Sequence, residues 1–275
     1  MSPPADTLYY KTYSSHPDKD WVVFVHGAGG SSTIWFRQLK EFREAFNVLF
    51  VDLRGHGQST HSFERHFRNP YTLEGVTQDL IDVLDKLEIH RAHFIGVSLG
   101  TLLIRTLEEM QPSRVYSVVQ CGAIMRLNIR SRFLIWGGHL IKRWVPFIWL
   151  YRLFSWIILP RANHQESRHH FIREARKMAK KEFLRWFRLS YEMIPVMRVF
   201  RQNESPNPTL YVMGREDHMF LPAIQTMVNH HHNSELHVIE ECGHVCNIER
   251  PDEFNRVAIA FLSKHASTSH NALTD

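Results

Sequence analysis

The sequence predicts an α/β fold in which helices flank a mostly parallel central sheet and a helical cap is inserted into the chain. Short apolar runs alternate with longer amphipathic stretches across residues 21–122, and the same alternation returns across residues 209–264. Residues 123–204 lack such strand-like runs and are rich in Trp, Arg and Lys. We therefore predict a core domain formed by residues 1–122 and 205–275, with residues 123–204 as its cap.

Each predicted strand is a short apolar run followed by glycine or polar residues. In the first block the strands are expected at residues 21–25, 48–51, 93–96 and 115–119, and the helices at 33–44, 72–87 and 99–110. In the second block the strands are expected at 209–213 and 235–239, and the helices at 222–229 and 251–264. Because strands joined through helices run parallel, their carboxyl ends are expected to meet at one edge of the sheet.

The composition is that of an ordinary globular protein, since 44% of the 275 residues are hydrophobic and 22% are charged. This excludes the disordered and fibrous classes. The polar segment Met1–Asp20 has no apolar signal-peptide core. Three cysteines form an odd number without framework spacing, so we expect a reducing, cytoplasmic location. The longest apolar stretch, residues 133–159, is interrupted by charges, so no membrane-spanning helix is expected.

The formal net charge of +5 is unevenly distributed along the chain. Residues 126–201 contain 17 Lys and Arg but four Asp and Glu, whereas the rest of the chain contains 16 and 24. Three interpretations of this basic insertion stay open: steering of an anionic substrate, contact with an anionic membrane surface through residues 143–161, or a solvated outer face. Its aromatic residues are expected to form the cap core and to roof an apolar pocket; they are Trp136, Trp144, Phe147, Trp149, Tyr151, Phe154 and Trp156.

The segment Gly96-Val97-Ser98-Leu99-Gly100 is a Gly-x-Ser-x-Gly motif between a predicted strand and a predicted helix. That context is typical of a nucleophile elbow, in which a tight turn leaves no room for side chains at the flanking positions and exposes the serine hydroxyl. The turn also brings the Leu99 N–H and the helix N-terminus near a developing oxyanion. We therefore predict Ser98 as the nucleophile.

A serine nucleophile needs a base, and the base needs an orienting acid. Asp217 follows the strand at 209–213, and His244 follows the strand at 235–239, so both are expected at the carboxyl edge of the sheet. Glu216 stays open as an alternative acid. His218, beside Asp217, and Val245, beside His244, are expected to line the substrate site.

The segment His26-Gly27-Ala28-Gly29-Gly30 is a glycine-rich loop after the first strong strand. Its backbone can approach a substrate closely, so we assign a second oxyanion donor to Ala28, with Gly29 as the alternative, and expect Gly27 and Gly29 to line the substrate site. His26 and the turn at residues 52–57 are interpreted as structural. A phosphate cradle is excluded because no Gly-Lys-Ser/Thr follows the glycines.

Two other clusters of metal-ligand residue types are interpreted differently. Cys242-x-His244-x-Cys246 offers three ligands without a fourth, and His230-His231-His232 is interpreted as a solvated helix end. We therefore expect no metal and no cofactor. No motif supports nucleic-acid binding, so no nucleic-acid partner is expected.

Together these motifs resemble the α/β-hydrolase superfamily, in its branch of small capped serine esterases and lipases. The resemblance extends from about Leu8 to Leu262 and includes Asp52-x-Arg54-Gly55-x-Gly57-x-Ser59 as well as His26-Gly27 and the three motifs around Ser98, Asp217 and His244. It implies a cap inserted after the sixth strand. It also implies Ser98 as nucleophile, His244 as base, Asp217 as orienting acid, and the Ala28 and Leu99 amides as the oxyanion hole. The cap matches no family pattern, so the resemblance does not identify a substrate.

The expected function is hydrolysis of a carboxylic ester with an apolar acyl or alkyl part, through an acyl-enzyme intermediate. A lactonase, a thioesterase and a carbon–carbon bond hydrolase stay open on the same residues. From another class, a non-catalytic ligand receptor that retains the three residues also stays open. The expected partner is a small ester, lipid contact through the cap stays open, and the sequence does not indicate an oligomeric state.

Overall fold

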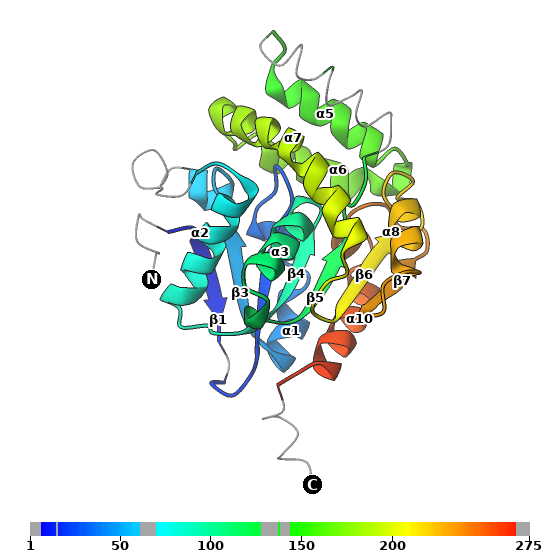
Figure 1. The fold of residues 1–275 in the computed structure, drawn as a ribbon. Helices are drawn as coiled ribbons and strands as arrows, with labels where there is room; N and C mark the ends of the chain where they lie inside the picture. Colours follow the sequence, from blue (N-terminus) through cyan, green and yellow to red (C-terminus); the bar gives the residue numbers. More distant parts are fainter. Residues whose placement is uncertain (1–6, 15, 61–69, 128–136, 138–143, 268–275) are drawn as a thin grey trace.

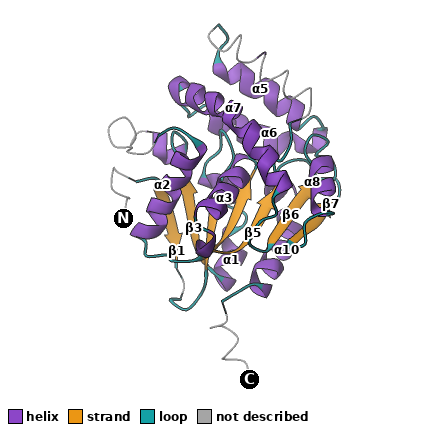
Figure 2. Cartoon of the chain, in the orientation of Figure 1, coloured by secondary structure: helices purple, strands orange, loops and turns teal. Residues whose placement is uncertain are grey.

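A computed structural model describes residues 7–14, 16–60, 70–127, 137 and 144–267 (Figure 1, Figure 2). Within them, seven strands form one sheet in the order β1-β3-β2-β4-β5-β6-β7. The β1 strand is antiparallel to β3, and every other pair is parallel. The strands are β1 Tyr9–Tyr13, β2 Trp21–Val25, β3 Asn47–Asp52, β4 Ala92–Val97, β5 Val115–Cys121, β6 Thr209–Gly214 and β7 Ser234–Ile239.

The described helices lie on both faces of this sheet and above one of its ends (Figure 2). The α-helices are α1 Leu39–Ala45, α2 Leu73–Lys86, α3 Leu99–Met110, α5 Phe147–Ile158, α6 Gln165–Ala175, α7 Lys180–Gln202, α8 Leu221–Val228, α9 Cys246–Glu249 and α10 Pro251–Lys264. The short 3-10 helices are η1 Ser32–Trp35, η2 Gly57–Thr60, η3 Pro112–Arg114 and η4 Ala162–His164. None of the helices in the described part of the chain is long and apolar enough to cross a membrane.

The alternation of side chains along β2 builds the two halves of the core. Val23 and Val25 belong to a buried cluster that includes the apolar faces of α2 and α3. Val22 and Phe24 point the other way, into a cluster with residues of α1 and α10. Because both faces are covered, the strand is apolar along its whole length, as expected for a central parallel strand.

The predicted α/β architecture with a mostly parallel sheet is confirmed, and a strand is found at each of the six predicted segments, with three differences. The edge strand β1 was not predicted, because its residues are polar or half-buried. The helix predicted at 33–44 is divided into η1 and α1. Before α1, the buried Gln38 side chain donates to the Asn247 carbonyl at 2.9 Å and to Asn255 Oδ1 at 3.1 Å, which fixes the chain there.

The third difference concerns the place of the cap, which the resemblance puts after the sixth strand. Among the described residues it follows β5, the fifth strand along the chain. One strand, β1, precedes β2, whereas a cap after the sixth strand would require two. Helices α5, α6 and α7 fall within the residues predicted as cap and lie together above the sheet (Figure 1). We refer to residues 123–204 as the cap segment; its positions 128–136, including Trp136, and 138–143 lie outside the described residues.

Candidate active site

Ser98 lies in a sharp turn between β4 and α3, with φ 54° and ψ −117°. Such a positive φ in a non-glycine residue is strained, and strain of this kind is concentrated at functional sites. The glycines on either side of Ser98 are required because a larger side chain would collide with neighbouring atoms. A Cβ on Gly96 would lie 2.7 Å from Ile104 Cδ1, and a Cβ on Gly100 would lie 2.2 Å from the Val25 carbonyl oxygen. The Gly-x-Ser-x-Gly motif therefore folds as the predicted strand–turn–helix.

His244 and Asp217 are brought together from the loops that follow β7 and β6. The Nδ1 atom of His244 lies 2.7 Å from Asp217 Oδ2, and both side chains are buried. The other carboxylate oxygen, Oδ1, accepts the Phe220 N–H at 3.2 Å, so the carboxylate is held in place. The His244 Nε2 atom is buried and has no hydrogen-bond partner in the described part of the chain.

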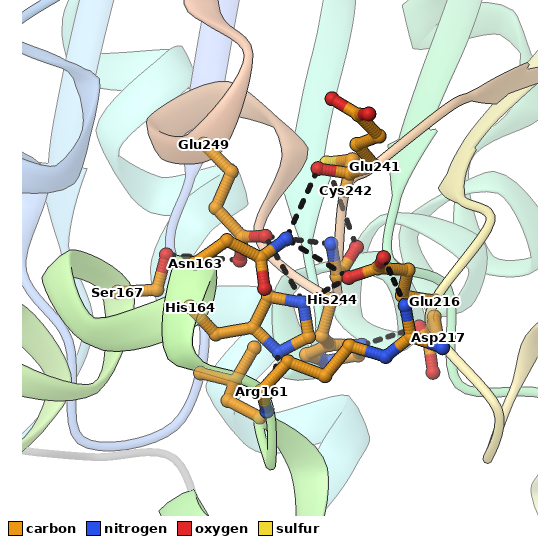
Figure 3. A network of polar contacts seen from close by, with 12 residues as sticks. Arg161, Asn163, His164, Ser167, Glu216, Asp217, Glu241, Cys242, His244 and Glu249 are labelled. Atoms are coloured by element: carbon orange, nitrogen blue, oxygen red, sulfur yellow. Dashed lines mark hydrogen bonds and ion pairs between the residues drawn. The ribbon is translucent and has the colours of Figure 1, made fainter.

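Glu216, the alternative acid, makes its side-chain contacts with residues of the cap segment (Figure 3). Its carboxylate pairs with Arg161 and accepts hydrogen bonds from Asn163 at 2.9 Å and from His164 at 2.8 Å. Burial raises the pKa of this carboxyl. The hydrogen bonds from Asn163 and His164 and the charge of Arg161 have the larger, opposite effect, so the pKa lies below its usual value. Of the two candidate acids, the geometry places Asp217 against His244.

The loop after β2 lies directly against Ser98. A Cβ on Gly27 would lie 3.0 Å from Ser98 Cβ and 3.7 Å from its hydroxyl oxygen. The Gly29 N–H is already used, because it donates to His56 Nε2 at 2.9 Å. No acceptor is found within the described residues for the N–H groups of Ala28 and Leu99. Of the two candidates in this loop, Ala28 therefore has the free amide.

Two buried histidines hold this loop in shape. His26 Nε2 accepts the Leu53 N–H at 2.9 Å, so its Nδ1 donates to the Gly27 carbonyl at 2.8 Å. His56 accepts from Gly29 through Nε2, so its Nδ1 donates to the Arg54 carbonyl at 3.0 Å. Burial lowers the pKa of both histidines, which keeps them neutral and suited to these paired roles. Their contacts agree with the structural interpretation of His26 and of the turn at residues 52–57.

A cavity of about 230 Å³ joins these residues. Its lining is almost entirely apolar and comes from two sources. The core contributes Gly27, Ala28, Gly30, Ile34, Val97, Ser98, Leu99, His244, Val245 and Ile248. The cap segment contributes Ile124, Tyr151, Phe154, Ser155, Ile158, Leu159, Ser167, His170, Phe171, Phe183, Trp186, Phe187, Ser190 and Met193.

The predicted substrate-lining residues divide between the cavity and its surroundings. Gly27 and Val245 line the cavity. Gly29 does not line it, because its backbone is turned toward His56 and the ring of Tyr151. His218 is exposed and lies outside the lining, because its position in the turn before α8 directs it to solvent. We therefore leave Gly29 and His218 out of the substrate site.

The cap residues in the lining include several that the sequence did not single out. Phe171, Phe183, Trp186, Phe187 and Met193 come from α6 and α7. The signal available in the sequence is the recurrence of Phe183, Trp186, Phe187 and Ser190 at helical spacing, which marks one face of α7. That face alone could not say whether it packs against other helices or surrounds a cavity.

The three cysteines are free and buried in the described structure. The Cys242 and Cys246 thiols lie near backbone carbonyls of Gly243 and Val212, while His244 between them faces Asp217. No group of three or more His, Cys, Asp or Glu side chains within the described residues is arranged to hold a metal ion. Cys242, His244 and Cys246 therefore do not point toward a common ligand position.

Comparison with known proteins gives a consistent family. Residues 22–257 match the model of the "Alpha/beta hydrolase family". The chain is 28% identical over 262 residues to the "Putative carbamate hydrolase RutD" of Pseudomonas syringae, covering 90% of this chain and 95% of that protein. It superposes on the enol-lactonase from Burkholderia xenovorans with a TM-score of 0.76 at 23% identity, covering 93% and 96% of the two chains. A thermophilic esterase from Thermogutta terrifontis gives 0.76 at 18% identity, covering 94% of each.

Proposed function

Because this chain belongs to the α/β-hydrolase family, we propose that it is a serine hydrolase that cleaves carboxylic esters with an apolar acyl or alkyl part. One observation carries the proposal. His244, held by Asp217 at 2.7 Å through Nδ1 and without a partner at Nε2, lines the same apolar cavity as Ser98. A buried imidazole with one nitrogen fixed by a carboxylate and the other free is the arrangement of a general base beside a nucleophile.

In the acylation step, Ser98 Oγ forms a bond to the ester carbonyl carbon while His244 Nε2 takes the hydroxyl proton. The Ala28 and Leu99 N–H groups stabilise the negative charge that develops on the carbonyl oxygen. When the tetrahedral intermediate collapses, the bond from carbon to the alcohol oxygen breaks, and His244 returns its proton to that oxygen. The alcohol leaves and the acyl group stays on Ser98.

In the deacylation step, His244 removes a proton from a water molecule as the water oxygen attacks the acyl carbon. The bond to Ser98 Oγ then breaks, Ser98 takes the proton back, and the carboxylic acid leaves. Asp217 does not exchange protons in either step. Its carboxylate keeps the Nδ1 proton of His244 in place and stabilises the imidazolium that forms twice in each cycle.

The cavity supports the substrate class. Its apolar lining, drawn from both the core and the cap segment, suits a hydrocarbon part of the ester, and its volume of about 230 Å³ favours compact esters. A lactone is the second candidate substrate, because a structural neighbour is named as an enol-lactonase and the same steps open a cyclic ester. The three free, buried cysteines favour a reducing compartment, and we propose the cytoplasm on that basis.

The test combines a substrate panel with a covalent probe. Hydrolysis of p-nitrophenyl esters, thioesters and lactones of increasing length identifies the bond that is cleaved and the size that fits. Ser98→Ala should reduce kcat by at least about 10⁴-fold and abolish labelling by a fluorophosphonate. Ser190→Ala is the matched control, because Ser190 also lines the cavity but donates to the Phe187 carbonyl at 2.6 Å. A wild-type protein that neither hydrolyses the panel nor takes the probe would contradict the proposal and favour a ligand receptor.

A further inference from the structure

Helix α5 is apolar on two opposite sides. Its inner side lines the cavity with Tyr151, Phe154, Ser155 and Ile158. Its outer side exposes three large side chains at the spacing of one helical face: Trp149 is 63% exposed, Leu153 47% and Trp156 56%. Trp144, just before the helix, is 87% exposed. We call Trp144, Trp149, Leu153 and Trp156 the outer face of α5.

This outer face is unusual for a surface in water. All the tryptophans that are exposed in the described part of the chain lie on it, and the others are buried or half-buried. A surface helix normally turns one apolar side inward and a polar side outward. An exposed cluster of large apolar side chains marks an interaction site. Figure 1 shows α5 at the outer end of the molecule, beyond α7 and away from the sheet.

The charged residues of α5 and of its flanking sequence are all basic. The sequence contains no Asp or Glu from Gly122 to Gln165. Arg152 is exposed on α5 and follows Trp149 by three residues and precedes Trp156 by four, so it lies on the same side of the helix. The Arg168 guanidinium, which is buried, lies 4.1 Å from the centre of the Trp156 ring. A partner for this face therefore combines negative charge with an interior that accepts indole rings.

We propose that the outer face of α5 docks on the surface of a lipid bilayer with anionic headgroups. Tryptophan is enriched at the boundary between headgroups and acyl chains, where its ring is half in apolar and half in polar surroundings. Basic residues beside such rings add attraction to anionic lipids. The proposal goes beyond the proposed function and does not depend on it.

The area of the face favours a bilayer over a second copy of the chain. The exposed parts of its three tryptophans amount to about 400 Å², taking about 200 Å² for a whole aromatic side chain. A stable protein interface needs about 800 Å² from each partner. A bilayer needs no matching protein surface, so a small apolar patch with cations beside it is sufficient for reversible docking.

Docking would place the bilayer on one side of α5 and the cavity on the other. Tyr151, Phe154 and Ile158 belong to the same helix as the outer face. A shift of α5 on contact with lipid would therefore also move this wall of the cavity. In this proposal α5 has two roles, as a wall of the cavity and as a membrane-contact helix.

The experiment measures sedimentation of the full chain with vesicles. Vesicles of phosphatidylcholine alone are compared with vesicles in which part of it is replaced by phosphatidylglycerol. The variant Trp144→Ser/Trp149→Ser/Leu153→Ser removes most of the outer face and leaves the contact of Arg168 with Trp156 intact. Met110→Ser is the matched control, because Met110 is also an exposed apolar residue but ends α3, the helix that starts at the cavity and runs to the other end of the sheet.

We expect the wild-type chain and Met110→Ser to bind the anionic vesicles, and the triple variant to bind at least tenfold more weakly. Arg152→Gln should reduce the preference for anionic over neutral vesicles. All variants replace exposed side chains, so circular dichroism and thermal unfolding should match the wild type. Absence of wild-type binding, or equal binding by the triple variant, would overturn the proposal. So would a concentration-dependent dimer in analytical ultracentrifugation that the triple variant lacks, because a second copy would then cover the face.

Discussion

Replacing Asp217 by asparagine tests the orienting acid more sharply than any other change in the site. Asp217 Oδ1 accepts the Phe220 N–H at 3.2 Å, and Oδ2 faces His244 Nδ1 at 2.7 Å. In Asp217→Asn the amide oxygen would keep the bond to Phe220, so the amide NH₂ would face His244. Nδ1 would then have to accept a hydrogen bond, and the imidazole proton would move to Nε2.

The size of the effect follows from this change of tautomer. An Nε2–H cannot take the proton of Ser98, so the population of competent enzyme falls and the imidazolium loses its buried counter-charge. We expect kcat to fall about 10⁴-fold, which corresponds to about 5 kcal/mol of transition-state stabilisation. The substitution changes the volume of the side chain very little, so the protein should fold.

Glu216→Gln is the matched comparison at the neighbouring position. The Glu216 carboxylate contacts Arg161, Asn163 and His164 of the cap segment, and no hydrogen bond to His244 is found among the described residues. We expect kcat to change less than tenfold and unfolding to be easier by about 1–2 kcal/mol, because charged hydrogen bonds are lost. The assay is hydrolysis of p-nitrophenyl acetate with urea unfolding of each variant. A loss of about 10³-fold in Glu216→Gln, with Asp217→Asn within tenfold of wild type, would refute the assignment of the acid.

Three further predictions concern a buried carboxyl in α3, the loop after β2 and the turn at Ser98. Burial raises the pKa of Glu108 to about 7, whereas the unfolded chain releases this proton near pH 4.5. The folded protein therefore loses stability as the pH rises through 7. Between pH 5 and pH 8, the free energy of urea unfolding should fall by about 2–3 kcal/mol more in the wild type than in Glu108→Gln. His56→Ala removes the acceptor of the Gly29 N–H, so kcat/KM for p-nitrophenyl acetate should fall between about tenfold and 100-fold; unchanged kinetics would mean that the loop holds its shape without His56. Gly100→Ala places a Cβ 2.2 Å from the Val25 carbonyl oxygen and should cost at least about 2 kcal/mol in urea unfolding; an unchanged urea midpoint would mean that the turn can move to accept the methyl group.

The parts of the site that the sequence predicted are those fixed by local geometry. Gly96, Ser98 and Gly100 are within five residues of one another, and the tight turn that they require is a property of that segment. Asp217 and His244 each follow a strand of a parallel sheet, so the topology alone brings them to one edge. Tyr9–Tyr13 shows the limit of local patterns, because an edge strand with a polar face carries little of the apolar signal of β2 or β3.

The parts that the sequence could not predict depend on contacts between distant segments. The neighbouring residues Glu216 and Asp217 are chemically similar, and the proposed role of each depends on which of them contacts the cap segment and which contacts His244. The choice between Ala28 and Gly29 is decided by His56, which lies in another loop. In both pairs the side chain or amide is equally suited to either role, so only the folded arrangement distinguishes them.

His164 links the cap segment to the two loops that carry Asp217 and His244. Its Nε2 lies 2.8 Å from Glu216, the residue before Asp217, and 3.7 Å from Glu249 (Figure 3). Glu249 in turn accepts the N–H of Gly243, the residue before His244, at 2.6 Å. One buried side chain of the cap segment thus contacts the supports of both loops that carry the proposed acid and base. The segment that lines the cavity therefore also holds these two loops in position. Exchanging it for the cap of another family member should change kcat as well as KM. A cap that only selected substrates would change substrate specificity alone.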